Sequence, residues 1–137
     1  MKIILDTNIW ISFLLGKKLS ELTEIFKRED IKIYVSESLI REIREVSNRS
    51  KFSKYITPRS IEALMELIAV KCDYIDSDIQ EDPEIRDKKD IFILGMAKNI
   101  PANLIVIGDK DLLVLENFGE SKIVTFHQFK KEYLELK

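Results

Sequence analysis

The sequence predicts an α/β fold, a three-layer α/β/α sandwich with a mainly parallel central sheet. Short apolar runs alternate along the chain with longer segments of helical periodicity, a pattern typical of strands joined by helical crossovers. The apolar runs are nearly continuous, as in parallel strands that are covered on both faces. The chain has 137 residues, the length of one domain, so we expect a single domain over residues 1–137.

The expected strands follow the apolar runs Ile3–Leu5, Ile31–Val35, Leu104–Ile107 and Ile123–Val124. The expected helices follow the periodic segments Leu19–Arg28, Glu37–Asn48, Pro58–Val70, Asp87–Lys98 and a terminal stretch from Gln128. Thr57 is a favourable N-cap, because Pro58 then takes the first helical position.

Composition excludes several classes of chemistry. The chain has 22 basic and 24 acidic residues, one Cys and one His. A single Cys excludes an internal disulfide framework and a Cys-based zinc site, and one His leaves little imidazole chemistry. Oxygen atoms must therefore carry any catalysis. The sequence shows no targeting segment and no run of about 18 apolar residues, so we expect a cytoplasmic protein without a membrane span.

Acidic residues follow two of the predicted strands directly. Asp6 comes after the first strand, and Asp109 and Asp111 come just after Leu104–Ile107. Ligands of open α/β sheets bind beyond the carboxyl ends of the strands, which makes these acids candidates for a site. Two structural roles compete with this interpretation: Asp6 is also a favourable helix N-cap, and Asp is common in turns.

Two further acids lie at the edge of predicted helical core faces. With about 100° per residue, Glu42 falls beside the apolar stripe of Leu39, Ile43 and Val46, while the other charges of this helix lie opposite, at Arg41, Arg44 and Glu45. Asp90 begins a helix that is apolar nearly all round and lies along its core-facing row. Glu42 could instead extend to water, and the macrodipole favours an acid such as Asp90 at a helix start.

Taken together, Asp6, Glu42, Asp90 and Asp109 can converge on the carboxyl edge of one sheet. Carboxylates that share a pocket repel one another and resist ionisation unless a cation compensates their charge. An all-oxygen ligand set favours a hard cation, Mg²⁺ or Mn²⁺. Such ions activate water and stabilise charge on a phosphodiester, so the acids indicate metal-dependent phosphodiester hydrolysis.

The segment Arg41–Arg59 is basic, with six basic residues against two acidic ones, a local charge of +4. Because it adjoins Glu42, we expect RNA to approach over this segment, with Arg44 and Arg49 as phosphate-binding residues. A solvated surface is the competing interpretation. The segment Asp73–Asp87 is strongly acidic, which also suits a solvated surface.

Four motifs, in this order, resemble those of PIN domains, and most closely those of small prokaryotic toxins of toxin–antitoxin systems. They are Leu5-Asp6-Thr7-Asn8, the segment Ser36–Val46 with Glu42, the segment Asp87–Asp90 followed by an apolar run, and Gly108–Leu113 with Asp109 and Asp111. The resemblance covers essentially the whole chain.

The resemblance implies a PIN-like sandwich and an Mg²⁺- or Mn²⁺-dependent endoribonuclease that cleaves single-stranded RNA. The implied catalytic and metal-binding acids are Asp6, Glu42, Asp90 and Asp109, with Asp111 as a further metal ligand. A homodimer and a small antitoxin protein that blocks the site are also implied. Related chains often have Thr or Ser before the last Gly-Asp pair, where this chain has Ile107, so we expect Thr7 or Asn8 to support the metal ligands instead.

Two other classes of function compete with a nuclease. A non-catalytic PIN-like scaffold that binds RNA or metal would be distinguished by its failure to degrade RNA in a chelator-sensitive way. A phosphoacceptor receiver-like domain would carry two adjacent acids after its first strand, whereas Asp6 stands alone. Of the remaining residues, Trp10 and Phe13 are expected in the core or a dimer surface, Cys72 in the core, and His127 at the surface or a helix cap.

Overall fold

The computed structural model describes residues 1–16, 19–75, 96–97, 100, 102–108, 117–118 and 121–134, and it confirms the α/β fold. Its sheet has the strand order β3-β2-β1-β4-β6-β5. The strands β3, β2, β1, β4 and β6 run parallel to one another. The edge strand β5 pairs antiparallel with β6. The strands are β1 Lys2–Leu5, β2 Lys32–Ser36, β3 Asp73–Ile75, β4 Leu104–Ile107, β5 Asn117–Phe118 and β6 Ser121–Thr125.

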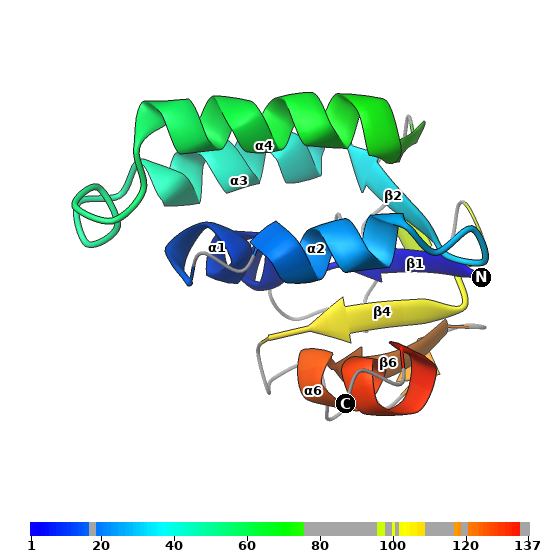
Figure 1. Cartoon of the computed structure of the whole chain (residues 1–137). Helices are drawn as coiled ribbons and strands as arrows, with labels where there is room; N and C mark the ends of the chain where they lie inside the picture. The colour runs from blue at the N-terminus through cyan, green and yellow to red at the C-terminus, as the bar shows by residue number, and fades with distance from the viewer. Residues whose placement is uncertain are drawn as a thin grey trace.

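Helices cover the sheet along its length (Figure 1). They are α1 Thr7–Leu15, α2 Leu19–Phe26, α3 Glu37–Ser47, α4 Pro58–Lys71, α6 Phe126–Phe129 and a π-helical turn η2 Lys130–Leu134. The helix α3 contacts α1, α4 and β2, whereas α6 contacts β6 and β4. Within the described part of the chain, no helix is long and apolar enough to cross a membrane.

The central strands are buried on both faces, as their continuous apolar sequences predict. Consecutive residues Ile3, Ile4 and Leu5 of β1 are fully buried, and all four residues of β4 are buried. Because successive side chains of a strand point to opposite faces, this burial means that both faces of the sheet are covered here.

The structure contains three elements that the sequence analysis did not predict, the helix α1 and the strands β3 and β5. In α1, Ile9, Trp10, Ile11, Phe13 and Leu14 are all buried, and the exposed strip is narrow and includes an apolar residue, Leu15, so the helix lacks the wide polar face that reveals an amphipathic helix. The strands β3 and β5 have three and two residues and lie at the two edges of the sheet, where a short run carries little periodic signal.

The other helix boundaries agree closely with the predicted ones. Thr57 is the N-cap of α4 and forms a reciprocal capping box with Ser60. The terminal helical stretch begins at Phe126, two residues before the predicted Gln128, because Thr125 and Gln128 form a second capping box. The predicted helix Asp87–Lys98 lies outside the described residues except for Met96 and Ala97, which are helical and buried.

The predicted core position of Trp10 and Phe13 is confirmed, since both side chains are fully buried. Their rings meet edge to face at a centroid distance of 6.1 Å, and Phe13 meets Phe126 in the same way at 5.6 Å. These contacts join α1 to α6. Cys72 differs from its prediction: it caps the carboxyl end of α4 and is only partly buried.

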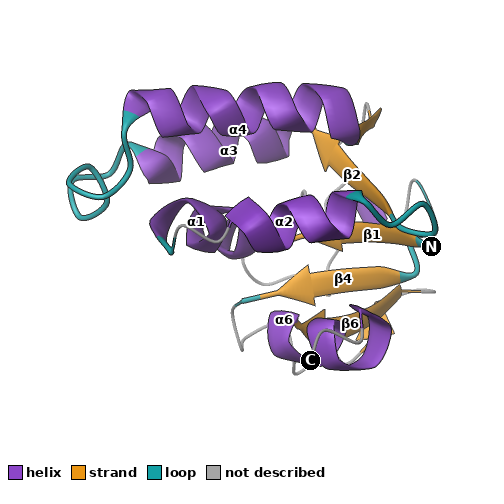
Figure 2. Cartoon of the chain, viewed as in Figure 1, coloured by secondary structure: helices purple, strands orange, loops and turns teal. Residues whose placement is uncertain are grey.

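The junction between β1 and α1 is fixed by buried hydrogen bonds. The indole Nε1–H of Trp10 donates to the carbonyl oxygen of Leu5 at 3.1 Å. The backbone NH of Asp6 donates to the carbonyl oxygen of Val106 at 2.9 Å, which continues the pairing of β1 with β4 by one residue. The strand β1 ends at the edge toward which the parallel strands point (Figure 2), and this bond holds the backbone at Asp6 there.

The variant Trp10→Phe tests this junction. It keeps an aromatic ring but removes the buried donor to Leu5, so the free energy of unfolding should fall by about 1–3 kcal/mol. Urea denaturation of both proteins measures the difference, and Tyr55→Phe at an exposed position serves as a control that should change little. A Trp10→Phe protein as stable as the wild type would show that the indole bond does not hold the junction.

Candidate active site

Asp6 is a buried acid whose carboxylate is not used to cap a helix. Its backbone occupies the N-cap position of α1, since its carbonyl oxygen accepts from the amides of Ile9 and Trp10 at 3.0 and 3.3 Å. The side chain makes no capping hydrogen bond, although it is only 8% exposed. The backbone of Asp6 therefore caps α1, whereas its carboxylate forms no capping hydrogen bond, although the first-turn amides of Thr7 and Asn8 lower its pKa.

The surroundings of Asp6 make its negative charge costly. Burial raises the pKa of its carboxyl from 3.8 to about 6, and the negative charge of Glu42 acts in the same direction. The backbone NH groups of Gly108, Thr7 and Asn8 lower this pKa but do not offset burial. A positive charge placed beside Asp6 and Glu42 would relieve this cost.

Glu42 lies where the helical pattern of α3 predicts it, at the border of the buried stripe. Leu39, Ile43 and Val46 are buried, Glu42 is half-buried, and the exposed charges of the opposite face are Arg41, Arg44 and Glu45. The buried Thr7 hydroxyl donates to Glu42 Oε2 at 3.2 Å. Glu42 is thus turned toward α1 rather than extended into water, and it lies against the residue next to Asp6.

The carboxyl end of β4 lies close to the first turn of α1, which follows Asp6. Gly108 follows β4, and a Cβ atom at this position would come within 3.3 Å of Asn8 Cβ and 3.4 Å of Ile9 Cδ1. Such a contact is tighter than van der Waals packing normally allows, so glycine permits the close approach of β4 to α1. Sequence reasoning did not assign Gly108 a role; its position directly after a strand and before an acid was the available signal.

The structure thus brings together Asp6, Thr7 and Glu42, with Asn8 next in the chain. The predicted acids Asp90, Asp109 and Asp111 lie outside the described residues, and those that are described include no cluster of three or more metal-ligating side chains. The donors that do converge are oxygen atoms, and one of them belongs to a buried carboxylate with a raised pKa. This chemistry fits a hard divalent cation.

The predicted phosphate-binding residues differ in their surroundings. Arg44 donates to Glu62 of α4 at 2.6 Å, and Arg41 donates to Glu37 at 3.2 Å, so the charges of both are largely neutralised. Arg49 follows α3, is exposed, and forms no ion pair with a described acid. Ile107, in the position where related chains often carry a hydroxyl, is buried in the core.

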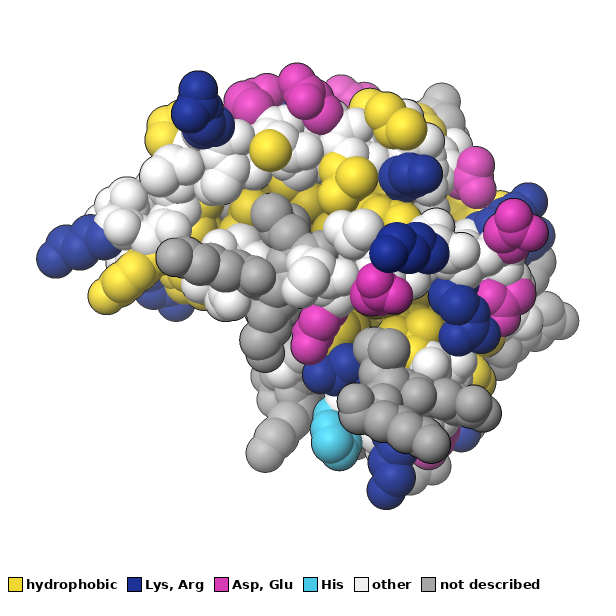
Figure 3. Space-filling model, in the orientation of Figure 1, with side chains coloured by type: hydrophobic (Ala, Val, Ile, Leu, Met, Phe, Trp, Pro, Cys, Tyr) yellow, Lys and Arg dark blue, Asp and Glu magenta, His cyan; other side chains and the backbone are white. Residues whose placement is uncertain are grey.

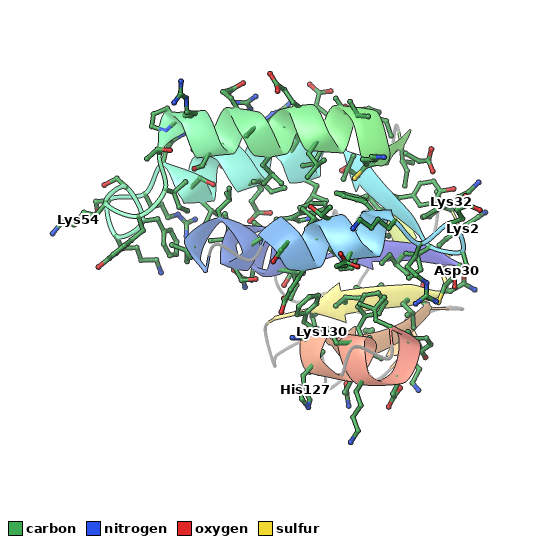
Figure 4. The ribbon with its side chains drawn as sticks, in the orientation of Figure 1. Lys2, Asp30, Lys32, Lys54, His127 and Lys130 are labelled. Carbon is green, nitrogen blue, oxygen red and sulfur yellow. The ribbon has the colours of Figure 1, made fainter. Side chains whose placement is uncertain are left out.

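The single histidine lies at the surface, as predicted. His127 is exposed on α6, which packs on β6 and β4, whereas Glu42 belongs to α3 beside β2 (Figure 4). Strand β1 separates β2 from β4 in the sheet. His127 and Glu42 thus belong to elements on opposite sides of β1 in the sheet order.

Comparison with known proteins gives two matches. The family model of the PIN domain matches residues 2–111. The crystal structure of VapBC2 from Rickettsia felis, bound to a DNA fragment from their promoter, superimposes with a TM-score of 0.62 over 92% of this chain and 99% of that chain. The sequence identity is 15%, so this likeness concerns the fold. No curated protein matches the sequence.

The raised pKa of Asp6 predicts a pH dependence of stability in the metal-free protein. The folded chain holds the Asp6 proton to about pH 6 and the unfolded chain to about 3.8, so the folded state binds more protons between these values. The free energy of unfolding should therefore fall as pH rises from about 4 to about 6, by up to about 3 kcal/mol, and this contribution should stay constant above that range.

Asp6→Asn removes the titrating group and should remove this fall, so that the variant is at least as stable as the wild type at neutral pH. Urea denaturation in chelator at several pH values between 4 and 7 compares the two proteins. If their free energies of unfolding run parallel across this range, Asp6 does not carry the buried charge described above.

Proposed function

The chain belongs to the PIN domain family, and from this premise we propose that it is a divalent-metal-dependent endoribonuclease that cleaves single-stranded RNA. The observation that carries the proposal is the buried carboxylate of Asp6 beside Glu42 at the carboxyl edge of the sheet. Burial of the Asp6 carboxylate next to a second acid costs free energy in the absence of a cation, whereas a cation that acts on phosphate needs acids placed in this way.

The ligands proposed for the cation are Asp6 and Glu42, with Asp90, Asp109 and Asp111 from the segments that lie outside the described residues. When bound, Mg²⁺ or Mn²⁺ would polarise a phosphate oxygen and lower the pKa of a water molecule. The acids act in this proposal as ligands, because the single histidine is exposed on α6 and the single Cys caps the carboxyl end of α4.

The contribution of the chain itself is to hold these acids in place before a substrate arrives. The backbone bond from Asp6 to Val106 and the indole bond from Trp10 to Leu5 fix one acid. The hydroxyl of Thr7 fixes the other, since it donates to Glu42. Groups held in this way need little reorganisation during the reaction, which is how such sites lower a barrier. In this proposal Thr7 takes the supporting role that was expected of Thr7 or Asn8.

We also propose that the chain is the toxin of a toxin–antitoxin pair, that it acts in the cytoplasm as a homodimer, and that a small antitoxin protein blocks its site. The sequence resemblance described above supports this, and so does the likeness in fold to VapBC2, which was crystallised on promoter DNA. Co-expression with the product of an adjacent gene, followed by an RNA cleavage assay, tests for the antitoxin.

Replacement of the acids should separate the nuclease from a non-catalytic scaffold. Asp6→Asn and Glu42→Gln should abolish cleavage of a labelled single-stranded RNA with Mn²⁺. Thr7→Val, which loses only the hydrogen bond to Glu42, should lower the rate roughly 10- to 100-fold. His127→Ala should cut at nearly the wild-type rate, and chelator should stop all cleavage.

A wild-type rate from Asp6→Asn would mean that the cleavage comes from another site or a contaminant. If His127→Ala were the inactive protein instead, the roles proposed for the acids would be wrong. A wild-type protein that binds RNA but never cleaves it would favour the scaffold.

The contrast between Arg49 and Arg44 predicts different effects on RNA binding. Arg49→Ala should weaken binding and reduce the slope of log affinity against log salt by about 0.7, the value for one phosphate contact on a single strand. Arg44→Ala should change the slope less, because Glu62 already pairs with Arg44. Lys32→Ala, at the amino-terminal edge of the sheet (Figure 4), is the control. If the three variants changed RNA binding equally, the Arg41–Arg59 segment would be ordinary solvated surface with no particular role in RNA binding.

A further inference from the structure

The loop between α3 and α4 projects from the body of the molecule (Figure 1) and carries only positive charge. We call residues 48–59, which are this loop and the first two residues of α4, the α3–α4 tip. No acidic residue occurs between Glu45 and Glu62, while the tip holds four basic residues, Arg49, Lys51, Lys54 and Arg59. All four are exposed, and none forms an ion pair with a described acid. The positive charge predicted for the Arg41–Arg59 segment is therefore concentrated in the tip.

The same segment of the chain also carries an exposed aromatic side chain, Tyr55. Tyr55 is 69% exposed, the second most exposed of the large hydrophobic residues in the described part of the chain. Single exposed apolar residues are common on protein surfaces and need no explanation by themselves. Tyr55 differs from such residues because basic residues flank it in the chain on both sides and no acid is near in sequence. Dark blue and yellow side chains accordingly meet at the projecting end of the molecule (Figure 3).

The backbone that presents Tyr55 is well defined. Its amide donates to the carbonyl oxygen of Phe52 at 2.9 Å, and so does the amide of Ile56. Phe52 packs against the core, with Lys51 Nζ 4.8 Å from the centre of its ring, and Ile56 is buried. The residues on both sides of Tyr55 thus anchor the tip, so the exposure of Tyr55 is a fixed feature of the fold.

The tip also lies within reach of the proposed site. The helix α3 carries Glu42 and ends at Ser47, five residues later, which is about 8 Å along the helix axis. The tip begins there and projects on the side of the sheet to which the strands point (Figure 2). A chain of nucleotides that passes the acids can therefore continue over the tip.

We propose that Tyr55 stacks on an unpaired base of single-stranded RNA whose phosphates lie along Arg49, Lys51 and Lys54. This inference rests on the proposed nuclease function and adds the part of the protein that selects a single strand. A cationic surface that follows the backbone, with an aromatic ring on which a base stacks, is the general basis of single-strand binding. A duplex offers no free base face to the ring, so the tip favours single-stranded over double-stranded substrate.

The experiment measures the affinity of a short fluorescein-labelled oligouridylate by anisotropy in chelator, where no cleavage occurs. Tyr55→Ala should weaken binding roughly 5- to 100-fold, the range that loss of one stacked base produces. Tyr55→Phe keeps the ring and should bind like the wild type. The matched control is Tyr74→Ala, since Tyr74 is 58% exposed and follows the other end of α4, a helix about 21 Å long.

A duplex of the same length should bind more weakly, and its affinity should not depend on Tyr55. Thermal melts should be unchanged in Tyr55→Ala, because the side chain is exposed. Wild-type affinity in Tyr55→Ala, or equal losses in Tyr55→Ala and Tyr55→Phe, would overturn the stacking proposal. If the wild type still cleaves RNA with Mn²⁺ in that case, the proposed nuclease function stands; if the wild type neither binds nor cleaves RNA, both fail together.

Discussion

Burial of the Asp6 carboxylate is the constraint around which this end of the sheet is built. The ladder between β1 and β4 continues to the amide of Asp6, so the chain cannot turn this residue out to water without breaking a buried backbone bond. Burial, together with the nearby charge of Glu42, raises the pKa of the carboxyl to about 6. Burial of an ionised carboxylate lowers the stability of the metal-free fold, and such a feature is usually retained for function. The oxygen ligands at this place are suited to binding a cation, which would compensate the buried charge.

The helix α3 joins the two charged regions of the protein. Its buried face packs on α1 and β2 and sets Glu42 against Thr7. Its exposed arginines are held by acids of α3 and α4, so they add little positive charge near the site. Its carboxyl end leads into the α3–α4 tip, where the cations have no such partners among the described residues. The acids of the proposed site and the cations of the α3–α4 tip are thereby separated along α3. A polyanion can contact the cations of the tip while its backbone passes the acids.

The sequence predicts much of this arrangement because two kinds of signal are strong in it. Continuous apolar runs located β1, β2, β4 and β6, and the narrow apolar stripe of α3 placed Glu42 correctly. The helix α1 was missed because most of its circumference is buried and its exposed strip is narrow, which weakens its periodicity. The sequence could not show which cations of the basic segment form ion pairs, since the pairing of Arg44 with Glu62 depends on how α4 packs. The convergence of Asp6 and Glu42 follows from the topology, whereas the hydrogen bond from Thr7 required coordinates. The roles of Asp90, Asp109 and Asp111 stay predictions.

The central claim is that the buried acids exist to bind a divalent cation, and calorimetry of Mn²⁺ binding near pH 6 tests it most directly. At this pH the Asp6 carboxyl is partly protonated, so a cation that binds there must displace protons. Titrations in two buffers of different ionisation enthalpy measure those protons. The account predicts that the wild type binds Mn²⁺ with release of protons and that Asp6→Asn binds far more weakly. Equal Mn²⁺ affinity in the two proteins, or binding without proton release, would contradict it.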